Sequence, residues 1–206
     1  MATTRTTFKV CEPLWQHFTQ QTEALFLKRD AFLNHMIRLE IPRLEQELEG
    51  RKELSEKARR YLAGELKRLD GQPKTVVIEQ ETADDLDKVV KRMNLFRDGF
   101  INRLIVWLRS SDVLLQKLQI PTTLDELGES NGGEPNGMPV SPLGAIEAVR
   151  NDPFTYIREY LKPAGSGGVY TVHFPEELIG LSCYLDDEQI PDTEAYNLKK
   201  MLGETL

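Results

Sequence analysis

The stretch Arg97-Asp98-Gly99-Phe100-Ile101-Asn102-Arg103-Leu104-Ile105 decides the fold, because a related stretch stands earlier in the chain. The earlier one reads Arg29-Asp30-Ala31-Phe32-Leu33-Asn34-His35-Met36-Ile37, an offset of 68 residues. The same offset aligns the whole of Thr7–Ile37 with Thr75–Ile105 without a gap. Seven aligned pairs are identical: Thr7/Thr75, Leu27/Leu95, Arg29/Arg97, Asp30/Asp98, Phe32/Phe100, Asn34/Asn102 and Ile37/Ile105. A match that stays colinear over three expected elements indicates an internal duplication.

The second copy shows the clearer pattern of secondary structure. Residues 74–79 form a short β-rich run in which apolar and polar faces alternate. Thr82 is expected to cap a helix, and Asn94 suits a left-handed stop at its end. Apolar residues recur at helical spacing between them: Leu86, Val89, Val90 and Met93. A second helix is expected to open at Phe96-Arg97-Asp98.

The order strand, helix, tight turn, helix resembles the ribbon-helix-helix family of DNA-binding proteins. Three features of the second copy carry the resemblance: the lone strand, the Met93-Asn94-Leu95 turn and the Arg97–Ile105 opening of the second helix. The first copy matches in outline, with strand Thr7–Val10, a helix near Pro13–Phe26 and a helix from Arg29. The resemblance covers roughly 80 of the 206 residues, and the family's motif is degenerate in sequence.

The resemblance has a physical consequence for how the copies are used. One unit alone has an unpaired strand and an open apolar face, so it is not stable by itself. Members of the family pair their strands into an antiparallel ribbon that enters the major groove of DNA. Both halves lie on one chain here, so the resemblance implies an intramolecular pseudo-dimer. Its two unequal halves would suit an asymmetric DNA site.

We therefore predict a mainly α-helical protein with an α+β C-terminal part, built on a tandem ribbon-helix-helix pseudo-dimer with a two-stranded antiparallel ribbon. The expected divisions are 1–40 for copy one, 41–73 for a helical connector, 74–121 for copy two, 122–140 for a linker and 141–206 for a small acidic α+β partner-binding module. In that last module, Val169–Phe174 and Leu181–Leu185 are expected to be strands, and helices are expected after Ser141 and Asp152 and over Thr193–Leu202. In the connector, Pro42 is expected to bend or restart the helix.

The charge of the chain is unevenly distributed. The net charge is −7, which alone would argue against nucleic-acid binding. Residues 1–121, however, hold 21 Lys and Arg against 18 Asp and Glu, whereas residues 122–206 hold 5 against 15. The repeat-bearing part is therefore mildly basic and the rest strongly acidic, as expected for a DNA-facing part joined to a different module.

The strand face that points away from the core is the candidate reader of DNA. In copy one it comprises Arg5, Thr7 and Lys9, and in copy two Thr75 and Val77. Arg5 and Lys9 can contact bases or phosphates, and Val77 can touch a thymine methyl group. A plain solvated strand face is the alternative interpretation. Glu79, at the end of the second strand, is unfavourable beside phosphates, which makes copy two the weaker reader.

The start of each second helix supplies further candidate contacts. Backbone N–H groups at a helix N-terminus attract phosphate, and the resemblance implies that this end clamps the DNA backbone. Lys28-Arg29 and Phe96-Arg97 stand at these positions. Arg29 and Arg97 could instead pair with Asp30, Asp98 or other nearby acids.

Several classes of function lack support in the sequence. No apolar run approaches the length of a membrane span and no signal-peptide pattern opens the chain, so we expect a cytoplasmic protein without a membrane partner. Cys11 and Cys183 show no metal spacing, and the three histidines are scattered. No catalytic triad, phosphate-binding loop or metal-ligand cluster is evident. We expect no enzyme activity, no metal and no cofactor.

Two functions fit these expectations. The first is sequence-specific binding of double-stranded DNA, as a transcriptional regulator or an accessory factor of a plasmid or mobile element. The second is an antitoxin-like or defence-complex subunit, whose repeats serve mainly as a scaffold and whose acidic C-terminal module binds and restrains an effector or toxin protein. Further homo-oligomerisation is compatible with either function.

Overall fold

The computed structural model describes residues 2–109, 116–117, 154, 157–158 and 168–191. The chain is mainly helical and contains one two-stranded antiparallel sheet among these residues. The elements are β1 (Thr3–Cys11), α1 (Glu12–Ala24), α2 (Arg29–Glu47), α3 (Glu56–Arg68), β2 (Gly71–Glu79), α4 (Gln80–Arg92), α5 (Arg97–Leu108) and two 3₁₀ helices, η1 (Glu176–Leu181) and η2 (Asp187–Gln189). We call β1, α1 and α2 the first unit, and β2, α4 and α5 the second unit.

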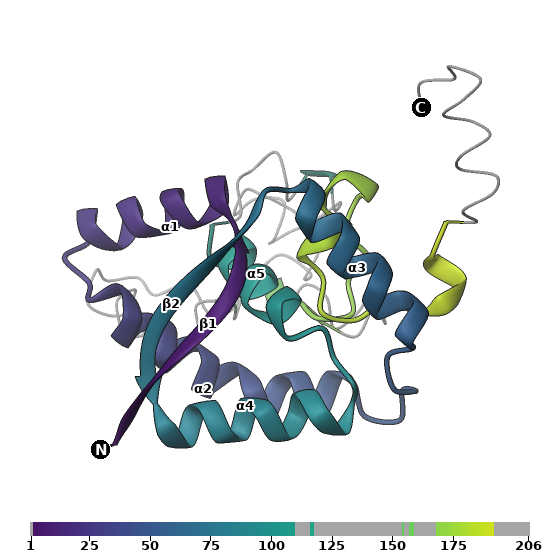
Figure 1. Ribbon diagram of the computed structural model, residues 1–206, viewed down its shortest axis with the longest axis horizontal. Coiled ribbons are helices and arrows are strands. Elements are labelled where there is room, and N and C mark those ends of the chain that lie inside the picture. Colours follow the sequence, from purple (N-terminus) through teal and green to yellow (C-terminus); the bar gives the residue numbers. More distant parts are fainter. Residues whose placement is uncertain (1, 110–115, 118–153, 155–156, 159–167, 192–206) are drawn as a thin grey trace, which may run out of the picture.

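The two strands lie side by side as a twisted ribbon across α5, with α1 on one side and α2 and α4 on the other (Figure 1). Thr7 pairs with Thr75, the two residues that the 68-residue offset makes equivalent. The centre of the strand pairing is therefore the point at which equivalent residues of the two copies face each other. Side chains of a strand alternate between its faces. Phe8, Val10, Val76 and Ile78 consequently point into the core, each at most 1% exposed.

The apolar residues form one cluster that is shared by both units, the α3 region and residues 168–190. The exposed polar face of α3 and its buried Ala58, Leu62 and Leu66 make it an amphipathic cover over the core. Helix α5 is buried on nearly all sides from Gly99 to Trp107. A helix of that kind needs neighbours all round, and residues 168–190 supply part of that surrounding layer.

The first helix of each unit ends in the same way. Asn94 adopts a left-handed conformation with φ of 50°, as predicted, and the Leu95 N–H donates to the Val90 carbonyl at 2.9 Å. In the first unit Phe26 takes that conformation with φ of 57°, and the Leu27 N–H donates to Thr22 at 2.8 Å. The repeat thus preserves a turn geometry even where the residue is unsuited to it.

Three local expectations were wrong. The residues expected as strands at 169–174 and 181–185 instead form turns, bends and the end of η1, because they follow the surface of α5 rather than pairing with each other. Thr82 does not cap α4, which begins two residues earlier at Gln80 and buries Thr82 completely. Of the bend or restart expected at Pro42, the restart is wrong, because α2 runs through Pro42 to Glu47.

Several other expectations lie outside the described residues. These are the linker at 122–140, the helix after Ser141 and the helix at Thr193–Leu202. Of the helix expected after Asp152 the structure describes Phe154, Ile157 and Arg158, and the Arg158 N–H donates to the Phe154 carbonyl at 2.8 Å, as in a helix.

Candidate nucleic-acid interface

The outer face of the ribbon carries the side chains that the sequence assigns to it. Arg5, Thr7 and Lys9 of β1 are exposed, as are Thr75 and Val77 of β2. The Thr7 and Thr75 hydroxyl oxygens lie 3.1 Å apart across the two strands, at the centre of the face. Arg5 pairs with Val77, and Lys9 with Pro73. Each end of the ribbon therefore presents one cation from β1 opposite one apolar side chain from β2.

The cations on this face form no close ion pair within the described residues, although the charge of Lys9 acts on the Asp98 carboxyl. Neither Arg5 nor Lys9 forms an ion pair with any residue in the part of the chain that the structure describes. Glu79 at the end of β2 is half-buried and lies 3.5 Å from Arg38, which draws its carboxylate toward α2. Arg5 and Lys9 can thus meet an external anion without first breaking an internal pair.

Both outer edges of the ribbon are held by the second helix of the opposite unit. The Lys9 N–H donates to Asp98 Oδ1 at 3.1 Å, and at the equivalent place the Val77 N–H donates to Asp30 Oδ2 at 2.9 Å. The edge N–H groups of a two-stranded sheet would otherwise be unpaired. These contacts fix the position of the exposed face relative to both helices.

A second pair of contacts repeats the same symmetry. Asn102 Oδ1 accepts from the Cys11 N–H and Asn34 Oδ1 accepts from the Glu79 N–H, both at 2.9 Å. Asn102 also donates to the Lys9 carbonyl at 2.8 Å. The identical Asp and Asn residues of the two copies are thus explained by the ribbon they support. Sequence reasoning found these identities, but it considered Asp30 and Asp98 only as possible partners of Arg29 and Arg97 and gave Asn34 and Asn102 no role.

Arg29 and Arg97 are both engaged within the chain. Arg29 donates to Asp30 at 2.8 and 2.9 Å and lies over the Trp15 ring at 4.5 Å. Arg97 donates to Thr6 Oγ1 at 2.8 Å and lies over the Phe8 ring at 4.5 Å. Its Nε is also 3.2 Å from Asp87. These contacts favour the interpretation in which the two arginines pair with nearby acids, and they argue against a primary role on phosphate.

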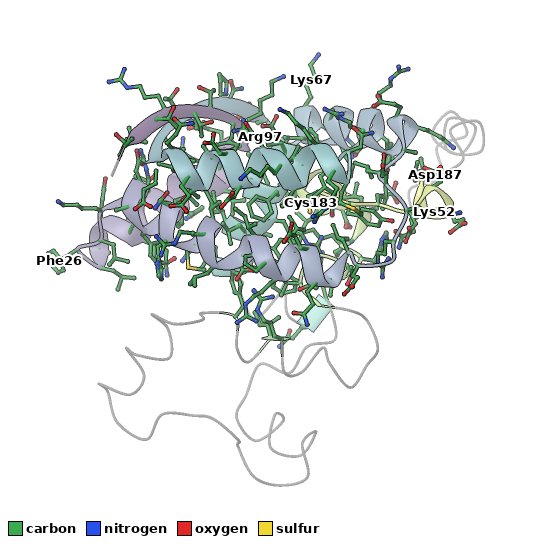
Figure 2. The ribbon with its side chains drawn as sticks, turned by 90° about the horizontal axis from the view of Figure 1, so that it is seen from below. Phe26, Lys52, Lys67, Arg97, Cys183 and Asp187 are labelled. Atoms are coloured by element: carbon green, nitrogen blue, oxygen red, sulfur yellow. The ribbon has the colours of Figure 1, made fainter. Side chains whose placement is uncertain are left out.

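The two second helices differ at their N-termini. Lys28, before α2, is exposed, whereas its repeat equivalent Phe96 is 8% exposed and donates its N–H to the Cys183 carbonyl at 3.1 Å. The chain itself therefore occupies the Phe96 N–H at the start of α5, so this N–H is not available for the phosphate contact expected there. Figure 2 shows Cys183 in the interior of the molecule, between the helices.

Beside the open end lies a groove of about 660 Å³ between α2 and β2. Its lining comprises Thr3, Lys28, Asp30, Ala31, Asn34, His35, Arg38, Val77, Ile78 and Glu79. The groove adjoins the exposed ribbon face through Thr3 and Val77. Lys28 extends the positive charge of Arg5 and Lys9 toward α2.

Burial changes the acid–base properties of one group at this interface. Burial raises the pKa of the Asp98 carboxyl, against the opposing effects of the Lys9 N–H bond and the Arg97 charge. Within residues 2–109 and the shorter described stretches, no three potential metal ligands gather into a site. No helix of that same part is long and apolar enough to cross a membrane.

The chain matches no protein-family model, no curated protein and no solved structure.

Proposed function

We propose that the chain is a double-stranded DNA-binding protein that reads the major groove with the outer face of its ribbon. In this proposal the two units form a tandem ribbon-helix-helix pseudo-dimer within one chain. The observation that carries it is the row Arg5, Thr7 and Lys9, exposed on a ribbon whose opposite face is core. A two-stranded ribbon has dimensions that fit the major groove.

The placement of the charges supports this use of the face. Arg5 and Lys9 offer donors for guanine edges or phosphates, and Val77, 43% exposed, offers a methyl surface for thymine. The cations line β1 and the apolar groups line β2, so each half of a site would meet both kinds of side chain. Lys28 at the open start of α2 is the further candidate for a phosphate.

The experiment selects duplexes from a random-sequence pool on the full chain and measures their binding by fluorescence anisotropy at several salt concentrations. Lys9→Ala and Arg5→Ala should each weaken binding by about 1–3 kcal/mol if the side chain contacts a base. A phosphate contact would instead lower the salt slope by about 1. Lys57→Ala is the matched control, because Lys57 is exposed at the start of α3, away from the ribbon (Figure 1).

Selection without enrichment, or variants that bind like the control, would contradict the proposal. The second candidate would then stand: a subunit that binds and restrains an effector protein, with the repeats as a scaffold. The internal pairing of Arg29 and Arg97 favours this candidate, because these two repeated cations already have partners within the chain.

A further inference from the structure

The internal repeat allows each surface of the first unit to be compared with its equivalent in the second. On α2, the side chains of Lys28, Ala31, His35 and Arg38 form one exposed helical face. Their equivalents on α5 are Phe96, Gly99, Arg103 and Val106, and all four are buried. The same face of the repeated helix is therefore open in one unit and closed in the other.

The closed face is covered by the chain's own C-terminal segment, residues 168–190. Arg103 donates to the carbonyl oxygens of Val169 and Val172 and, at 3.0 Å, to Ser182 Oγ. The Ser182 carbonyl lies so close to Gly99 that it leaves no room for a β-carbon there. This groove of the repeated unit thus accepts polypeptide through its backbone carbonyls: those of Val169 and Val172 lie in a turn and a bend, and that of Ser182 lies in extended chain.

The turns between the paired helices show the same contrast. In the second unit the connector covers the turn: the Leu54 N–H donates to the Met93 carbonyl at 3.0 Å, and Asn94 Nδ2 donates to the Leu54 carbonyl at 2.9 Å. Leu95 there is fully buried. In the first unit Leu25, Phe26 and Leu27 are 59%, 97% and 40% exposed. Figure 2 shows Phe26 projecting from the end of the molecule.

We propose that this open side of the first unit, the 25–27 turn together with the α2–β2 groove, binds an extended acidic segment of a partner protein that carries apolar side chains. The occupant is polypeptide because polypeptide covers both equivalent surfaces of the second unit. Three adjoining exposed apolar residues are suited to a protein partner and offer nothing to a phosphodiester backbone. The proposal does not depend on DNA binding.

The charges of the groove define the acidic character of the partner. Asp30 is neutralised by Arg29, and Glu79 lies beside Arg38. Lys28 is the cation left without a carboxylate in the described part of the chain, with His35 one helical turn beyond Ala31 on the same face. A partner segment with a carboxylate beside Lys28 and apolar side chains against the 25–27 turn would complement both the charged part and the apolar part of this surface.

The test selects peptides of about twelve residues from a random phage-displayed library on the full chain, a length suited to extended recognition. The selected peptides are then synthesised and titrated against variants. Ala31→Glu places a carboxylate in the groove, and Phe26→Asn removes the projecting ring at a left-handed position that Asn tolerates. Ala63→Glu, on the exposed side of α3, is the matched control.

The expected result is enrichment of acidic peptides with aliphatic or aromatic anchors, whose affinity falls about tenfold or more in Ala31→Glu and Phe26→Asn but not in Ala63→Glu. Absence of enrichment, or affinities indifferent to the two variants, would overturn the proposal. Loss of DNA binding without loss of peptide binding in these variants would assign the surface to nucleic acid and overturn it as well. If a water-soluble paramagnetic agent leaves the NMR signals of the Phe26 ring unbroadened, the 25–27 turn is covered by the chain itself. That result would also overturn the proposal.

Discussion

Phe26 and Asn94 occupy the same position of the repeated unit, and both adopt the same left-handed backbone conformation although only Asn is suited to it. Both have positive φ, and both follow a helix whose last carbonyls are satisfied by the same two N–H groups. Asn adopts this conformation readily because its short polar side chain tolerates it, whereas a bulky aromatic residue does not. Phe26 gains nothing in return from packing, because it is 97% exposed.

Phe26→Asn should therefore raise the free energy of unfolding, by about 0.5–1 kcal/mol, since it relieves left-handed strain without removing a buried contact. Urea unfolding followed by circular dichroism measures this change. Phe26→Ala, which keeps the strain, serves as the control and should give no comparable gain. A destabilised Phe26→Asn variant would show that the exposed ring contributes to the fold.

The identical residues of the two copies illustrate what the sequence can reveal at this scale. Asp30, Asp98, Asn34 and Asn102 were recognisable as repeated, yet their bonding to the opposite strand was not. A polar residue repeated on an otherwise apolar helical face needs a buried partner. The repetition of polar residues at these helical positions was therefore the signal in the sequence that pointed to these bonds. Which strand supplies the partner depends on how the units pair, and no local pattern contains that information.

At the scale of elements, the strands and the four helices of the repeat were predictable because the two aligned copies carry related apolar patterns. The C-terminal segment was not. Val169–Phe174 alternates like a strand, but Tyr170 stacks on Phe100 of α5 and Phe174 packs at a tilt against Trp107, so neither faces a sheet. Local alternation cannot distinguish a strand from a segment of turns and bends that packs alternate side chains on a helix.

A buried polar cluster fastens this segment to α2. Glu47 accepts from the Tyr170 N–H at 2.7 Å and from Arg158 at 3.2 Å, and Glu40 accepts from the Tyr170 hydroxyl at 2.8 Å. Burial raises the pKa of Glu47 to about 6, and Glu40 adds to this, although the Tyr170 N–H, Arg158 and Arg103 oppose it. The folded chain therefore holds this proton more tightly than the unfolded chain does.

Because the folded pKa of Glu47 lies above its unfolded value of 4.5, the associated stability is present below pH 4.5 and is lost as pH rises through about 6. The loss amounts to about 2 kcal/mol. Glu47→Gln lacks this titration, so its stability relative to the parent chain should rise by about that amount between pH 4 and pH 7. Urea unfolding of both proteins across this range measures the difference. Parallel pH profiles would show that Glu47 does not titrate in this window.

At the scale of the whole molecule, the two units exchange their supporting contacts. Asp98 and Asn102 of α5 hold β1, and Asp30 and Asn34 of α2 hold β2, so neither unit has a complete set of bonds by itself. The connector that joins them replaces a bimolecular association with an intramolecular one. The resemblance to ribbon-helix-helix proteins, applied to both copies, implied that β1 and β2 pair antiparallel, and they do. The uneven covering of the two units arises from segments outside the repeat, which the repeat pattern does not describe.

Cutting the chain between Gly50 and Arg51, both exposed, tests this interdependence. Fragments 1–50 and 51–206 should each lose most of their helical circular dichroism, because β1 and β2 are left without partners and the shared core is opened. Mixing them at equal concentrations should restore the signal. The melting temperature of the mixture should rise with protein concentration, whereas that of the intact chain should not if it folds as a single molecule. Suppose instead that fragment 51–206 alone gave the helical circular dichroism expected from its own helices in the intact chain, and that adding fragment 1–50 did not change it. The second unit would then fold by itself, and the contacts exchanged between the units would not be needed for folding.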